Sequence, residues 1–146
     1  MQAATTGRSM IGRHPALTLF SLASILLASF HIADDVARGF EPGGLKHIQT
    51  ILTLSLWLSG AVVLAGRRAG YVVMLLGAIL GMLISVAHMR GAGVVGGRIA
   101  GSSGTFFWVW TILALGITSV VSFVLAATAM FGRTDPLDRT EPGTDS

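Results

Sequence analysis

The side chains of this sequence that could do chemistry gather at the ends of long apolar runs. His31, Asp34 and Asp35 close the first run, His47 opens the second, and His88 closes the third. If these runs cross a membrane one after another, all five side chains lie on the same side of it. Neutral imidazole binds Zn, Cu, Fe and Ni, and carboxylates extend the range to Mn. Because zinc-type sites take three or four such ligands, the set predicts a site for a divalent transition metal.

The residues that close the first run share one helical face. His31, Asp34, Asp35 and Arg38 follow the spacing i, i+3, i+4 and i+7, which places them together if the helix continues to Arg38. Two acids at the negative end of a helix dipole are unfavourable, so a compensating charge is expected. It would come from a bound cation or from one of the nearby basic residues, which are Arg38, Lys46 and Arg90. Arg38 and Arg90 are the expected salt-bridge or anion partners, and a salt bridge alone would explain the acids without any ligand.

Other kinds of site receive less support from the sequence. Haem held by two axial histidines, His31 or His47 with His88, is the alternative to a metal ion, but haem usually lies deeper in a bundle than these end positions. The same residues could also carry protons, because a carboxylate beside a histidine raises its pKa. The chain has no cysteine, so thiolate sites and disulfides are excluded.

Enzymatic and nucleotide-binding signatures are weak. Ser102 and Ser103 are not in a nucleophile-elbow motif. The segment 91–96 matches GxGxxG, but it follows an apolar run instead of a strand, so a flexible linker is the simpler interpretation. The sequence therefore assigns no catalytic residue and favours a non-enzymatic function.

The elements that must position the cluster are membrane helices. Only 12% of the residues are charged, against about 25% in soluble domains, and mean hydropathy is +0.73. Runs of about 17–25 apolar residues are long enough to span a bilayer, where backbone groups must be satisfied within a helix. The sequence predicts an all-α integral membrane protein, an up-down bundle of four transmembrane helices. The predicted spans are 15–35, 47–66, 69–89 and 105–131.

The distribution of basic residues predicts the orientation. An even number of spans places both termini on one side, together with six arginines against four basic residues on the other side. These six are Arg8, Arg13, Arg67, Arg68, Arg133 and Arg139. By the positive-inside rule both termini are cytoplasmic, in a protein of the inner (plasma) membrane. Segment 1–14 is then a cytoplasmic N-terminal segment and 132–146 a disordered cytoplasmic tail.

Small and aromatic residues indicate how the helices pack. Gly77, Gly81 and Ser85 form a stripe along the third run, and small residues let membrane helices approach closely. His88 extends this stripe by one turn. Aromatic residues open the fourth run, where they are expected to anchor the helix among lipid head groups. They are Phe106, Phe107, Trp108 and Trp110.

The leading functional interpretation is a small multi-pass membrane protein whose outward-facing His/Asp cluster binds a metal cation or a polar ligand. One alternative is a redox subunit linked to haem or quinone. The other is a purely structural accessory subunit of a larger membrane complex. The expected partners are the lipid bilayer and either other membrane subunits or further copies of the chain, with no nucleic acid.

Overall fold

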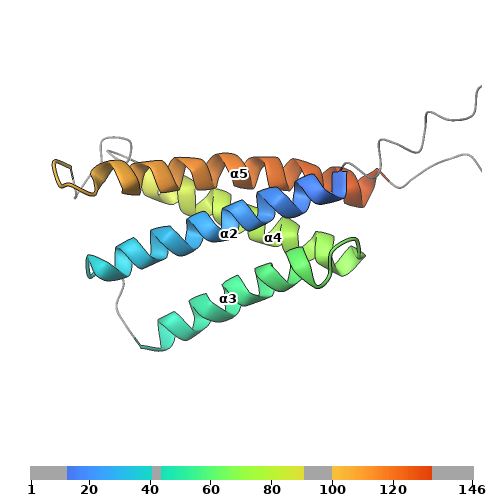
Figure 1. Cartoon of the computed structure of the whole chain (residues 1–146), viewed down its shortest axis with the longest axis horizontal. Helices are drawn as coiled ribbons and strands as arrows, with labels where there is room; N and C mark the ends of the chain where they lie inside the picture. Colours follow the sequence, from blue (N-terminus) through green and yellow to red (C-terminus); the bar gives the residue numbers. More distant parts are fainter. Residues whose placement is uncertain (1–12, 41–43, 91–99, 133–146) are drawn as a thin grey trace, which may run out of the picture.

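The structure, a computed structural model, describes residues 13–40, 44–90 and 100–132. This part of the chain forms four α-helices, which are α2 (Arg13–Ala37), α3 (Leu45–Val62), α4 (Arg68–Met89) and α5 (Thr105–Phe131). Successive helices run in alternating directions (Figure 1). The predicted all-helical class with four helices is confirmed. The predictions for 1–12, for the glycine-rich segment 91–96 and for the tail 133–146 lie outside the described residues.

Three of the four helices are long and apolar enough to cross a membrane. They are α2, α4 and α5, whereas the apolar part of α3 covers only His47–Val62. The sequence predicted that this span would continue to residue 66. Instead the backbone N–H groups of Val63 and Leu64 both bond to the Ser59 carbonyl, and Gly66 turns the chain with a φ of 77°. Hydropathy marks these residues as apolar but does not show where a helix ends.

The helices are not packed equally. α5 packs extensively along both α4 and α2, while α3 has fewer contacts, made mainly with α4 and α2. The N-terminal end of α3 lies apart from the other helices (Figure 1). The cluster of buried apolar side chains that forms the core extends towards the opposite end of the bundle, where it includes Leu17, Ala61, Tyr71, Met74 and Ala126. The end that holds the His/Asp residues contains a cavity of about 190 Å³.

The predicted stripe of small residues on α4 is buried. Gly77, Gly81 and Ser85 all lie within the bundle. A Cβ atom at Gly81 would overlap the hydroxyl of Ser119 on α5, and the Ser85 hydroxyl donates to the carbonyl oxygen of Ile112 at 3.0 Å. Close approach of α4 and α5 requires the small side chains of Gly81 and Ser85. The same stripe fixes the last turn of α4, which carries His88.

Candidate metal centre

Three of the five predicted ligands come together at one end of the bundle. His31 and Asp35 lie one turn apart near the end of α2, and His88 lies in the last turn of α4. One ligand atom from each of these three side chains lies within 4.8 Å of the other two. His31 is 2% exposed and Asp35 is 7% exposed. His31 and Asp35 are therefore buried although they stand near a helix end, and His88 is partly exposed, with 35% of its side chain accessible.

The three donor atoms form a triangle of the size that a metal ion requires. His31 Nε2 lies 3.3 Å from His88 Nε2 and 3.3 Å from Asp35 Oδ2, and His88 Nε2 lies 3.8 Å from Asp35 Oδ2. A point about 2.0 Å from all three atoms exists for a triangle of these sides, and zinc is bound by His nitrogen and carboxylate oxygen at about 2.0–2.2 Å. Edges of about 3.3 Å are also those of a tetrahedron with such bond lengths. Two edges of the triangle thus match one face of a tetrahedral site, and the third edge, between His88 and Asp35, is longer at 3.8 Å.

The Asp35 carboxylate is held by an aromatic side chain from another helix. Trp108, in the first turn of α5, donates its indole N–H to Asp35 Oδ1 at 3.1 Å. This bond occupies one carboxylate oxygen and leaves Oδ2 facing the two histidines. A hydrogen-bonded partner of this kind commonly orients a metal-binding carboxylate.

The tautomer of His88 follows from its backbone contact. Its Nδ1 lies 2.8 Å from the carbonyl oxygen of Ile84, which can only accept a hydrogen bond. Nδ1 therefore carries the proton, and in the neutral ring Nε2 presents a lone pair to His31 and Asp35. The His31 and His88 rings meet edge to face, with centroids 4.6 Å apart and planes at 88°. One histidine nitrogen and one carboxylate oxygen are thus oriented by neighbouring groups before any ligand binds.

The other predicted acid lies outside this cluster. Asp34 Oδ2 accepts a hydrogen bond from Nε of Arg38 at 2.7 Å. That bond raises the pKa of Arg38. The Arg38 guanidinium also lies against Gly104, where a Cβ atom would overlap it, so it ties the end of α2 to the start of α5. The expected salt bridge is present, but it neutralises Asp34 and not Asp35.

Arg90 and His47 occupy other positions at this end of the molecule. Arg90 is exposed after the end of α4, and its side chain pairs with no acid among the residues that the structure describes. His47 lines a cavity of about 190 Å³ together with His31, Asp35 and His88. It is not a member of the close group of three. Its Nε2 atom is buried and has no hydrogen-bond partner in the described part of the chain.

The two histidines of the cluster do not fit haem. Two axial nitrogens on opposite faces of one iron would be about 4 Å apart if each bond is about 2.0 Å, with the macrocycle between them. The Nε2 atoms of His31 and His88 are 3.3 Å apart, and their rings touch edge to face. No plane of a porphyrin can pass between them, so this pair does not provide the expected haem ligands.

The sequence reasoning missed two groups that hold the cluster, the Trp108 indole and the Ile84 carbonyl. Trp108 had been assigned to the aromatic belt, and its neighbours Phe106 and Trp110 are indeed exposed, at 79% and 56%. Trp108 differs because it turns inward and hydrogen-bonds Asp35. The sequence offered one indication of this contact: Trp108 stands at the start of the fourth apolar run, on the same side of the predicted membrane as the aspartates. Ile84 precedes His88 by four residues, the spacing at which a helical histidine can reach a backbone carbonyl.

Comparisons of the chain with family models, curated proteins and solved structures gave no match. The functional argument therefore depends on the geometry of the site.

Proposed function

We propose that this chain is a small multi-pass membrane protein that binds a zinc-type divalent metal ion through His31 Nε2, Asp35 Oδ2 and His88 Nε2. The observation that carries the proposal is the triangle of donor atoms, with edges of 3.3, 3.3 and 3.8 Å. Two further groups hold these ligands in position: Trp108 donates a hydrogen bond to Asp35, and the Ile84 carbonyl accepts one from His88. Supporting groups of this kind accompany most metal sites.

A bound cation also explains why Asp35 is tolerated where it lies. A buried carboxylate is costly unless it is paired or coordinates a metal. Within an apolar helix such a group commonly belongs to an ion, proton or ligand site. Arg38, the arginine that directly follows α2, is used by Asp34. A divalent ion would satisfy the Asp35 oxygen and the two imidazole lone pairs together.

The ligand set is that of a site with an open position. Three protein ligands from imidazole and carboxylate, plus one exchangeable ligand, are typical of zinc sites that act on a bound molecule, whereas closed structural sites use four protein ligands. The cavity beside the cluster reaches His47 and is the place for that fourth ligand. On the orientation supported by the arginine distribution, this end of the bundle faces away from the cytoplasm.

The experiment is a metal titration of the purified chain in phosphatidylcholine nanodiscs. The wild type is expected to bind one zinc ion per chain, and His31→Ala and His88→Ala are each expected to lose most of that binding. His14→Ala is the matched control, because His14 begins α2 at the end opposite to His31. Equal and negligible metal in all four proteins would overturn the proposal, as would equal retention of zinc in all four.

A further inference from the structure

An apolar groove leads from the cluster into the membrane-spanning part of the molecule. Its first section is the cavity of about 190 Å³ at the cluster, lined also by Ile32, Thr50 and Ile84. The next section, of about 210 Å³, shares those three residues and continues between α2, α3 and α4 to Trp57. A third section, of about 130 Å³, shares Thr53, Trp57 and Leu80 with the second. The shared walls make the three sections one continuous groove.

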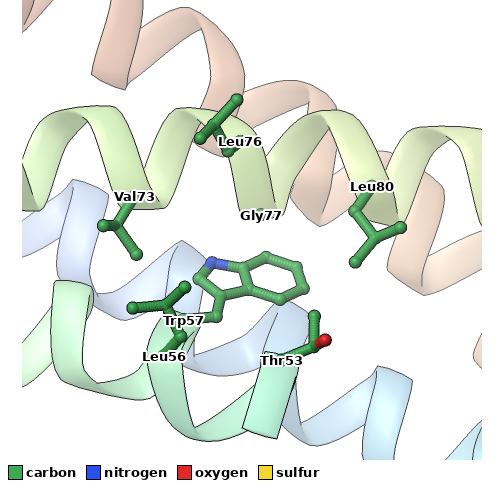
Figure 2. A pocket seen from close by; sticks show the side chains of 7 residues that line it. All are labelled: Thr53, Leu56, Trp57, Val73, Leu76, Gly77 and Leu80. Carbon is green, nitrogen blue, oxygen red and sulfur yellow. The ribbon is translucent and has the colours of Figure 1, made fainter. Parts of the chain in front are cut away.

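An aromatic ring forms part of the wall that the second and third sections of the groove share. Figure 2 shows the indole of Trp57 lying against Gly77, with Thr53 and Leu80 to one side of the ring and Leu56 and Val73 to the other. A Cβ atom at Gly77 would overlap this indole, so the ring packs directly on the α4 backbone. Trp57 is 2% exposed and has little room to move aside. His47 and Trp57 are ten residues apart, or about 15 Å along the helix.

The polarity of the groove changes along its length. The wall at the cluster presents imidazoles and a carboxylate, the second section is mainly apolar with Gln49, Thr50 and Thr53 among its lining residues, and the third section is almost entirely apolar. Each section is small, at about 190, 210 and 130 Å³, so the groove suits one narrow chain better than a pair of acyl chains lying side by side. The cluster lies at the helix ends, where the polar head of a membrane amphiphile lies naturally.

From these features we infer that the groove binds a single-chain amphiphile with a carboxylate head, whose head occupies the open position of the metal ion. This inference rests on the proposed metal site. A divalent ion with the single charge of Asp35 leaves one net positive charge, which a monoanionic head neutralises. The buried Nε2 of His47 borders the same cavity and is available to donate to the second carboxylate oxygen.

The test uses cobalt in place of zinc, because its visible absorption reports the ligands in the coordination shell. The Co²⁺-loaded chain in phosphatidylcholine nanodiscs is titrated with acetate, laurate and dodecanol. Laurate and acetate are expected to change the spectrum, laurate at the lower concentration, and dodecanol is expected to leave it unaltered. A response to dodecanol equal to that of laurate would contradict the assigned carboxylate head.

Two tryptophan substitutions on α3 separate binding in the groove from partition into the bilayer. Thr53→Trp fills the groove at a residue that lines two of its sections. Leu52→Trp adds similar bulk at a side chain that is 64% exposed and outside the groove. Thr53→Trp should raise the half-saturating laurate concentration by about tenfold, the scale of effect that forced overlap produces, and should leave acetate unaffected. Leu52→Trp should change neither ligand.

The outcomes distinguish this inference from the metal site itself. If Thr53→Trp and Leu52→Trp both bind cobalt and respond equally to laurate, the acyl chain does not bind in the groove, and the proposed metal site is unaffected by that result. A chain that takes up no cobalt would overturn both. His47→Leu provides a further check, because it should weaken laurate and acetate alike while the cobalt content stays the same. Loss of cobalt from His47→Leu would make His47 the fourth ligand and contradict an open position.

Discussion

The indole nitrogen of Trp108 lies 3.1 Å from Oδ1 of Asp35, and this contact joins the first turn of α5 to the last turn of α2. It leaves Oδ2 of the same carboxylate as the oxygen that faces His31 and His88. The Trp108 ring also lies 6.0 Å from each of the two imidazole rings, measured between centroids. One aromatic side chain thus orients the acid and contacts both histidines.

Removing the Trp108 donor should weaken metal binding without removing a ligand. In Trp108→Phe the carboxylate keeps its charge but loses the group that fixes its orientation. The expected loss of zinc affinity is about 10–100-fold, as for other groups that orient metal ligands. Competition titration against a chelator in nanodiscs measures it.

Trp110→Phe is the matched control for Trp108→Phe, because Trp110 lies on the same helix and is 56% exposed. Its zinc affinity should equal that of the wild type. If the two variants bind zinc equally well, the Trp108 contact has no orienting role.

Metal binding should also stabilise the fold, because its ligands join α2 to α4. These two helices have few direct contacts with one another. An ion present at about 100 times its Kd adds roughly 2.7 kcal/mol to the free energy of unfolding. Thermal unfolding in detergent should therefore show a midpoint that rises with zinc in the wild type and is insensitive to zinc in His31→Ala.

The seam between α4 and α5 should not tolerate added bulk. Gly81→Ala places a methyl group on the Ser119 hydroxyl, and overlap of this kind costs about 1–3 kcal/mol. A lower midpoint of thermal unfolding is expected. Leu83→Phe adds more volume at a position that is 60% exposed on the same helix, and its midpoint should change little. Equal midpoints for Gly81→Ala and the wild type would show that the seam can open without cost.

The ion pair between Asp34 and Arg38 should be separable from the metal site. Arg38→Gln removes the partner of Asp34 and leaves the partners of Asp35 in place. The zinc affinity of this variant is expected to stay close to that of the wild type, since the half-buried ion pair includes none of the three metal ligands. A large loss of zinc affinity, measured by the same chelator competition, would show that Arg38 helps to hold the metal ligands in position.

The sequence alone located the end of the bundle where the site lies, but not its final ligand set. Apolar run lengths placed the side chains of His31, Asp35 and His88 at one end, and the small residues before His88 indicated that its face of the helix is buried against a neighbour. The spacing i,i+4 fits both His31 with Asp35 and Asp34 with Arg38, and both pairs are present. Which of the two acids faces His88 depends on the rotation of α2 relative to α4. A hydropathy pattern carries no information about that rotation.

The features that sequence reasoning missed depend on tertiary packing. Trp108 was assigned with the other aromatic residues at the start of α5, and only the rotation of α5 against α2 turns it towards Asp35. α3 packs more loosely than the other helices, which leaves the groove beside Trp57 and keeps His47 apart from the cluster of three. The hydrophobic pattern of the sequence does not predict this looser packing. The end of α3 at Val62 depends on a glycine turn within a run that stays apolar.

The most direct test of the account compares the zinc affinity of two neighbouring acid-to-amide variants, Asp35→Asn and Asp34→Asn, in the same nanodiscs. The two substitutions remove the same charge from adjacent residues of one helix. Asp35→Asn is expected to lower zinc affinity by about 100-fold or more, because a ligand and its charge are lost, while Asp34→Asn is expected to bind zinc as the wild type does. Equal affinities for the two variants, or a larger loss in Asp34→Asn, would contradict the proposed centre of His31, Asp35 and His88.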